Sequence, residues 1–209
     1  MSTDFAERLN HVLAEHPSRS VRIDGARDAA VLVPIVAHPE PTLLFTLRTD
    51  TVRSHKGQVS FPGGSVDPAD PSPEAAALRE AHEEIGLDPA AVRVLGQLDP
   101  MPTFVTGFVV YPVVGWLEND PELLPNPAEV AEIIHVPVSG FTDDLRVAPG
   151  GLLHDRTYPT EAWNFNGHVI WGFTARLLRV LFSRLATAGL AAPLADQPDW
   201  PGIPEEFRI

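Results

Sequence analysis

Apolar side chains recur along this chain with two periods, one typical of helices and the other typical of strands. In residues 4–16 the apolar side chains recur at helical spacing, with Phe5 and Leu9 on one face. This spacing predicts an amphipathic opening helix. The segment 174–189, TARLLRVLFSRLATAG, has the same pattern and predicts a long closing helix. Helices are therefore expected near both ends of the chain, ahead of an irregular tail.

Short runs rich in β-branched and aromatic residues lie between these helices. Strands are predicted at 29–37, 42–48, 58–61, 92–98, 108–117 and 132–138. The first two flank Pro39 and Pro41 and are expected to pair, and Asn166-Gly167 between two further apolar runs is a strong hairpin signal. Strands interleaved with few helices predict an α/β or α+β domain, with helices packed on a mixed sheet.

A third helix is predicted over residues 73–85, because its ends carry suitable capping residues. Ser72 suits the N-cap, Pro73 fits the first helical position and Gly86 can adopt the left-handed conformation that follows a helix. At 100° per residue, the apolar residues Leu78, Ala81 and Ile85 share one face of this helix. Three glutamates are expected on the opposite face.

These glutamates, Glu80, Glu83 and Glu84, lie one turn apart or side by side. Like charges at this spacing repel by about 0.2–0.5 kcal/mol per pair, and the helix dipole disfavours anions near a C-terminus. A solvated acidic face is one interpretation. The other is a site for Mg²⁺ or Mn²⁺, which accept clustered carboxylate oxygens together with substrate phosphate.

Composition restricts the chemistry that this chain can perform. Its 209 residues suit one domain, and the absence of cysteine excludes disulfides, thiolate metal sites and cysteine nucleophiles. No apolar run approaches the roughly 18–20 residues of a membrane span, and the first ten residues lack the features of a secretory signal. We predict a cytoplasmic protein that does not bind membranes, as a monomer or homodimer.

The formal charge of −13 argues against a nucleic-acid partner, because phosphate binding requires basic surface. An acidic protein that acts on a phosphorylated small molecule needs divalent cations or a local basic cluster. Arg48, Arg53 and Lys56, the only lysine, lie within nine residues and form the most basic neighbourhood of the chain.

Residues 64–87 resemble the Nudix box, G-x5-E-x7-R-E-U-x-E-E-x-G-U, in which U is aliphatic. The segment from Arg79 to Leu87 matches its second half at every fixed position. The first half differs, because one residue is inserted in the loop after Gly64. With this insertion Asp70 stands where the box has its first glutamate, and Glu74 is the other acid nearby.

The resemblance implies a single Nudix domain over residues 1–209, a helix–sheet–helix sandwich around a mixed β-sheet. It implies a divalent-metal hydrolase of nucleoside diphosphates linked to another moiety. By position, Glu80 and Glu84 are the principal metal ligands, Glu83 is a third ligand or proton acceptor, and Arg79 orients these carboxylates.

Glycines precede this helix in the box. The resemblance implies that Gly63 and Gly64 let the backbone turn tightly beside the metal ions. A purely structural turn is equally compatible with them.

Residues 43–64 resemble a second pattern, L-L-T-x-R-[SA]-x3-R-x3-G-x3-F-P-G-G, which marks Nudix enzymes that cleave coenzyme A. Arg48, Arg53, Gly57 and the Phe61-Pro62-Gly63-Gly64 segment have the required spacing. The mild departures are at Phe45, Thr46 and Thr49. Coenzyme A carries a 3′-phosphate, which Arg or Lys commonly binds. Some of the residues Arg48, Arg53 and Lys56 are therefore expected to contact substrate phosphates, unless they pair with acids across the loop.

The expected reaction is metal-assisted hydrolysis of the pyrophosphate in coenzyme A or its thioesters, with Glu83 or Glu129 as proton acceptor. Glu129 precedes a predicted strand and could also be an extra metal ligand or simple loop surface. A broader pyrophosphatase of ADP-ribose, NADH or dinucleoside polyphosphates, and a nucleotide-binding module without activity, are the alternatives. The aromatic residues Trp163, Phe165 and Trp171 could stack on adenine, but hairpin aromatics more often belong to the core.

Overall fold

The computed structural model describes residues 2–19, 21–37, 39–49, 57–103, 107–147, 152–153, 156–157 and 161–194. Its helices are α1 (Ser2–Glu15), α2 (Pro73–Ile85) and α3 (Gly172–Thr187). The sequence predicted α2 with the observed limits and the other two helices to within two residues. Among the described residues, no helix combines the length and the apolar composition that crossing a bilayer requires.

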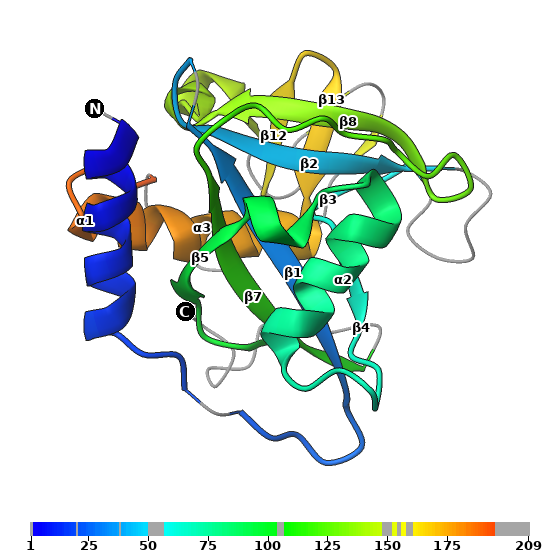
Figure 1. Ribbon diagram of the computed structural model, residues 1–209. Helices are drawn as coiled ribbons and strands as arrows, with labels where there is room; N and C mark the ends of the chain where they lie inside the picture. Colours follow the sequence, from blue (N-terminus) through cyan, green and yellow to red (C-terminus); the bar gives the residue numbers. More distant parts are fainter. Residues whose placement is uncertain are drawn as a thin grey trace.

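An eight-stranded mixed sheet forms the centre of the molecule (Figure 1). Its strands are β1 (Arg27–Val36), β2 (Thr42–Arg48), β3 (Val59–Ser60), β4 (Gly63–Ser65), β5 (Arg93–Gln97), β6 (Met101–Pro102), β7 (Phe108–Leu117) and β8 (Val130–Pro137). The main path runs β3-β2-β1-β7-β5, while β4 pairs with β1, β6 with β7 and β8 with β2. The mixed sheet of the predicted Nudix fold is therefore present.

Strand β1 has more neighbours than the sequence indicated. Its predicted pairing with β2 exists; it is antiparallel and confined to one end, where Ile35 lies opposite Leu43. Along its whole length β1 runs parallel to β7, and near its start it pairs with β4, with Val31 opposite Gly63. The Gly63-Gly64 segment is thereby paired with the central strand of the sheet.

Both faces of the sheet are covered by helices. Ala30 and Leu32 of β1 face the apolar side of α2, whereas Val33 and Ile35 belong to a larger core with α1 and α3. In Figure 1, α2 lies in front of β1 and β7, and α3 crosses behind them. The alternation along β1 explains why this strand is apolar almost throughout, since neither side faces water.

A small second sheet has the strand order β13-β12-β9, formed by β9 (Arg146–Val147), β12 (Ala162–Phe165) and β13 (His168–Trp171). Asn166 and Gly167 join the last two strands with φ values of 50° and 90°, as a type I′ turn requires. The predicted hairpin is confirmed. A further pair of short strands consists of β10 (Leu152–Leu153) and β11 (Arg156–Thr157), and the predicted irregular tail lies outside the described residues.

Candidate active site

The glycine segment before α2 makes two close contacts that a side chain would prevent. A Cβ atom on Gly63 would lie 2.3 Å from the carbonyl oxygen of Ala30. On Gly64, a Cβ atom would lie 2.5 Å from the carboxylate carbon of Glu80. The first glycine thus lets β4 approach β1, and the second leaves room for the Glu80 carboxylate against the backbone.

Helix α2 is capped as the sequence predicts. The Ser72 hydroxyl accepts a hydrogen bond from the Ala75 amide at 3.2 Å, and Pro73 occupies the first turn. At the other end, Gly86 adopts φ 68° and its amide donates to the His82 carbonyl. These local bonds fix where the helix begins and ends, and therefore which way the glutamates of its last turns point.

The expectation that all three glutamates lie on a face opposite the apolar residues is wrong for Glu84. Glu84 is 3% exposed and is buried with Ala81 and Ile85, whereas the Glu83 side chain is 56% exposed. The reason is that the Gly63 amide, brought under the helix by β4, donates to Glu84 Oε2 at 3.1 Å. A buried carboxylate is tolerated because it has this donor.

Burial changes the acidity of two of these groups. It raises the pKa of Glu84 to about 7, against the lowering effects of the Gly63 amide and the Arg48 charge. Burial also raises the pKa of Glu80, opposed by its hydrogen bond from Arg79. The negative charge of Glu129 raises both pKa values further, so Glu129 shares the electrostatic field of the helix glutamates.

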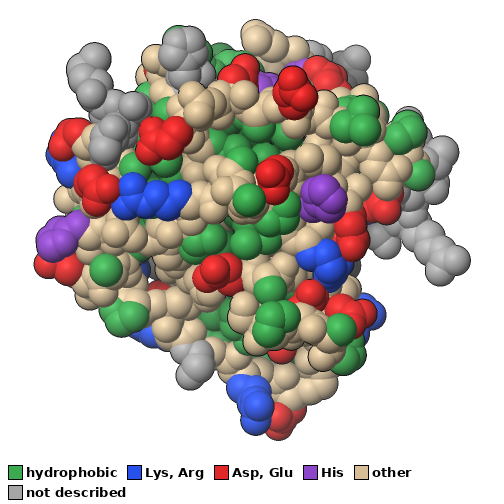
Figure 2. Space-filling model, viewed as in Figure 1, with side chains coloured by type: hydrophobic (Ala, Val, Ile, Leu, Met, Phe, Trp, Pro, Cys, Tyr) green, Lys and Arg blue, Asp and Glu red, His purple; other side chains and the backbone are tan. Residues whose placement is uncertain are grey.

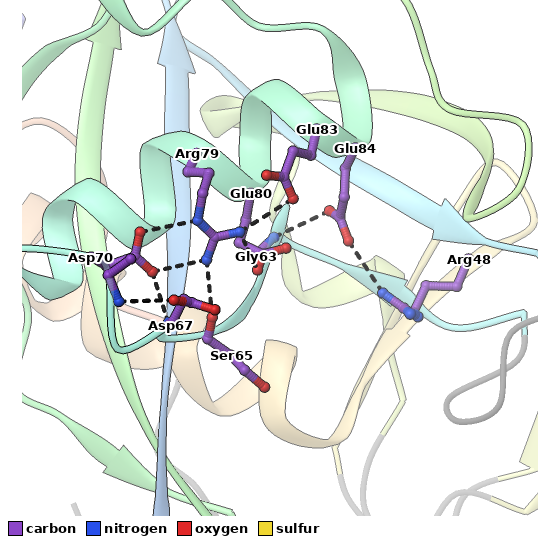
Figure 3. Close-up of polar contacts among 10 residues, drawn as sticks. Arg48, Gly63, Ser65, Asp67, Asp70, Arg79, Glu80, Glu83 and Glu84 are labelled. Atoms are coloured by element: carbon purple, nitrogen blue, oxygen red, sulfur yellow. Dashed lines mark hydrogen bonds and ion pairs between the residues drawn. The ribbon is translucent and has the colours of Figure 1, made fainter.

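Arg79 lies between the loop and the helix glutamates (Figure 3). Its Nε and Nη2 atoms donate to the two carboxylate oxygens of Asp70 at 3.0 and 2.9 Å. Its Nη1 atom donates to Glu80 at 2.9 Å and to Glu83 at 3.2 Å. Arg79 therefore contacts two of the carboxylates that the resemblance implies it orients.

Asp70 occupies the place that the box gives to its first glutamate. Arg79 pairs with Asp70, and among the described contacts it makes none with Glu74. The hydrogen bonds from Arg79 hold the pKa of Asp70 below its ordinary value. A turn supports this carboxylate, because the Asp67 amide donates to Asp70 Oδ2 at 2.8 Å.

Arg48 extends from the end of β2 to the opposite side of Glu84 (Figure 3). Its Nη1 atom lies 3.3 Å from Glu84 Oε1, so Arg48 makes the acid pairing that the sequence left as the alternative to phosphate binding. Its Nε atom is buried and has no hydrogen-bond partner among the described residues. Arg53 and Lys56 lie outside the described residues.

The fit of a divalent cation to these side chains follows from their charge and donor chemistry. Among the described residues, no three acidic or imidazole groups already converge as a metal centre, and Glu83 and Glu84 are paired with arginines. The oxygens nevertheless match those that Mg²⁺ and Mn²⁺ prefer. Burial is the main cause of the raised pKa values of Glu80 and Glu84, and a bound cation would favour the charged forms of both groups. Acidic side chains are also spread over the surrounding surface (Figure 2).

The hairpin aromatics belong mainly to the core. Trp163 is 2% exposed and its ring packs against Phe141, with 6.2 Å between the centroids. Phe165 packs against the same core, and Trp171 is half-buried. The structural alternative is therefore confirmed for Trp163 and Phe165.

Known proteins resemble this chain over most of its length. Residues 26–155 match the NUDIX domain family. NudL of Photorhabdus laumondii, an uncharacterized Nudix hydrolase, is 45% identical over 184 residues, which cover 86% of this chain and 95% of that protein. NudL of Klebsiella pneumoniae, also uncharacterized, is 41% identical over 180 residues, covering 85% and 91%.

Among solved structures, a MutT/nudix family protein from Enterococcus faecalis has a similar fold. It covers 87% of this chain and 74% of its own, with a TM-score of 0.53 and 16% sequence identity. At this identity the likeness supports the fold alone.

Proposed function

Because the chain belongs to the Nudix family and keeps the three glutamates in the second half of the box, we propose that it hydrolyses the pyrophosphate bond of coenzyme A or its thioesters. The products are 3′,5′-ADP and 4′-phosphopantetheine or its acyl form. The observation that supports this substrate is the coenzyme A-type pattern of residues 43–64, which runs in register into the box at Gly63 and Gly64.

The metal ligands in this proposal are Glu80, Glu83 and Glu84. When bound, Mg²⁺ or Mn²⁺ neutralises the pyrophosphate oxygens and lowers the pKa of the attacking water. Arg79, held by Asp70, keeps the Glu80 and Glu83 carboxylates oriented.

The attacking water loses its proton to a nearby carboxylate. Glu83 suits this role because its side chain is largely exposed, and Glu129 suits it because its charge acts on the same glutamates. Either side chain completes the reaction without a covalent intermediate.

Arg48 is proposed to contact a substrate phosphate together with Arg53 and Lys56. Only Nη1 of its guanidinium has a partner in the described contacts, and the buried Nε lacks one. The Arg48 side chain is 23% exposed, and planar guanidinium groups suit phosphate geometry.

The proposal is tested by incubating the protein with coenzyme A, dephospho-coenzyme A, ADP-ribose and NADH, in Mg²⁺ and in Mn²⁺, and separating the products by chromatography. We expect 3′,5′-ADP from coenzyme A with the highest kcat/KM. Preferred cleavage of ADP-ribose or NADH would indicate the broader pyrophosphatase. Nucleotide binding without turnover would indicate a binding module.

The phosphate contacts are tested by Arg48→Ala and Arg53→Ala, with Arg93→Ala as a control at a surface ion pair. We expect the first two variants to raise KM for coenzyme A more than KM for its dephospho form. Equal increases for both substrates would contradict contact with the 3′-phosphate.

A further inference from the structure

The segment between β7 and β8 is bonded to the end of helix α2. We call residues 124–129 the strap. The Leu124 amide donates to the Ile85 carbonyl and the Asn126 amide to the Glu84 carbonyl, both at 2.8 Å. These carbonyls belong to the last turn of α2, where they have no partner within the helix. The strap therefore supplies hydrogen-bond donors to the last turn of the helix that carries the predicted metal ligands.

Asn126 organises the rest of the strap. Its carbonyl oxygen accepts hydrogen bonds from the amides of Glu129 at 3.0 Å and Val130 at 2.8 Å. Its side-chain Oδ1 accepts from the Ala128 amide at 3.1 Å, which is the local bond by which asparagine stabilises a turn. One residue thus bonds both to the backbone of Glu84 and to the backbone of Glu129.

The strap is also attached to the sheet on its other side. The Thr49 amide donates to the Glu129 carbonyl at 2.9 Å, and the Thr49 hydroxyl donates to the Ala128 carbonyl at 3.2 Å. Thr49 follows the last residue of β2, next to Arg48. The backbone of Glu129 is consequently held between α2 and β2, and its carboxylate charge acts on Glu80 and Glu84.

We propose that Asn126 is a positioning residue, whose turn holds the Glu129 carboxylate beside the glutamates of α2. This inference rests on the proposed function in one respect, namely that these glutamates bind a divalent cation. Asn126 carries no charge and needs no contact with substrate or metal. Its side chain acts on the site through the turn that carries Glu129, and that restriction makes the inference testable.

The test is a double-mutant cycle of Asn126→Ala and Glu129→Gln, with Mn²⁺ affinity measured by electron paramagnetic resonance and kcat measured separately. We expect Glu129→Gln to weaken Mn²⁺ binding about tenfold, the lower end of the effect of outer partners of a metal site. Asn126→Ala should weaken it about threefold to tenfold in the unmodified protein. In the Glu129→Gln background it should change the affinity by less than about twofold.

Two further variants separate positioning from a general loss of structure. Asn126→Ser keeps a side-chain acceptor for the turn and should restore most of the Mn²⁺ affinity. Asn164→Ala removes the equivalent bond, from the Gly167 amide to Asn164 Oδ1, in the β12–β13 hairpin, and should leave Mn²⁺ affinity unchanged. Thermal unfolding of every variant verifies that it is folded.

Full additivity of Asn126→Ala and Glu129→Gln would overturn the inference, as would the absence of any effect of Asn126→Ala. Failure of the unmodified protein to bind Mn²⁺ would overturn both this inference and the proposed metal dependence. A protein that shows the expected coupling but does not hydrolyse coenzyme A keeps the role of Asn126. That result would overturn only the proposed substrate.

Discussion

Two arginine–carboxylate clusters in this molecule differ in burial and in charge balance. In the first, which we call the C-terminal cluster, Glu161 is 1% exposed and accepts from Arg179 Nε at 2.7 Å and lies 2.9 Å from Arg146 Nε. The Arg179 Nη2 atom donates to the same carboxylate. One acid is therefore matched by two cations, and the cluster joins β9 and the start of β12 to α3.

In the second cluster, which we call the box cluster, the acids outnumber the described arginines. Two described arginines, Arg48 and Arg79, face a larger number of acids. These acids are Asp70, Glu80, Glu83, Glu84 and Glu129. The pKa of Asp70 is lowered by its arginine, whereas the pKa values of Glu80 and Glu84 are raised.

The two clusters use the same kinds of side chain in different ways. A buried carboxylate that is fully matched stabilises the contact between two elements and has no need of a ligand. A cluster with excess carboxylates is costly as it stands, because desolvated like charges disfavour one another. A bound cation would offset this cost, and perturbed pKa values are typical of functional sites.

The largest expected effect is the loss of stability on Glu161→Gln. This substitution leaves two arginines in the C-terminal cluster without their anion, and breaking a buried ion pair on one side costs about 3–5 kcal/mol. The free energy of unfolding, measured with urea, should fall by this amount. Glu132→Gln is the matched control, because Glu132 forms an exposed pair with His168 and should cost less than about 1 kcal/mol.

A stability loss for Glu161→Gln no larger than for Glu132→Gln would show that the C-terminal cluster does not stabilise the fold. Activity per folded molecule should remain near that of the unmodified protein. A selective loss of activity would place Glu161 in the site instead.

The second expected effect is the loss of turnover on Glu84→Gln. The carboxylate charge is needed most when charge develops on the transferred phosphate, so kcat should fall more than KM rises. The expected fall is about 10²–10³-fold, as for the removal of other groups that stabilise a transition state. Glu74→Gln, on the first turn of the same helix, is the control. Near-normal turnover of Glu84→Gln would refute its assignment as a ligand.

Local signals in the sequence were sufficient for the limits of α2 and for its acids. Ser72, Pro73 and Gly86 act within a few residues of the helix ends, so their effect is readable without the rest of the chain. The burial of Glu84 was not readable, because a helical wheel contains no information about the strand beneath the helix. Its partners Gly63 and Arg48 are 21 and 36 residues away.

The C-terminal cluster and the strap were also beyond sequence reasoning. Glu161 precedes the buried residues Ala162 and Trp163, an unusual place for an acid, and this was the only local signal for the C-terminal cluster. Arg146 and Arg179 reach it from two other elements. Glu129 was selected by its position before a predicted strand, but its attachment to α2 depends on tertiary contacts that only the fold creates.

The third expected effect is a pH dependence of stability in the metal-free protein. The pKa of Glu84 is raised from 4.5 to about 7 in the folded state, so between these values the folded state binds more protons than the unfolded state. Its contribution to stability is therefore lost as pH rises from about 4.5 through about 7. Glu84→Gln should consequently be more stable than the unmodified protein at pH 8, by about 2–3 kcal/mol, and nearly equal at pH 5.

Urea unfolding in the presence of a chelator, at pH 5, 6, 7 and 8, measures this difference. Stability curves for the two proteins that stay parallel over this range would show that Glu84 is not a desolvated acid. The substitution that removes turnover is thus expected to stabilise the fold, whereas Glu161→Gln destabilises it. These opposite signs sharpen the distinction between the two clusters.

The smallest expected effect comes from the adjacent glycines of β4. A Cβ atom on Gly64 would meet the carboxylate of Glu80 at 2.5 Å, and one on Gly63 would meet the main chain of Ala30 and Val31 at 2.3 and 2.6 Å. The Glu80 side chain can move away, so Gly64→Ala should cost less than about 1 kcal/mol of stability. It should nevertheless lower kcat/KM about tenfold or more, because displaced catalytic groups lose rate steeply with distance.

Gly63→Ala is the matched variant, since the central strand cannot yield in the same way. It should cost about 1–3 kcal/mol of stability, as overpacking of a well-packed interior does. Thermal unfolding and steady-state kinetics of both variants, normalised to folded protein, distinguish the two outcomes. If Gly64→Ala lowered the unfolding temperature as much as Gly63→Ala and left kcat/KM intact, Glu80 would be a structural acid. The box cluster would then resemble the C-terminal cluster, because the position of its central carboxylate would not matter for turnover.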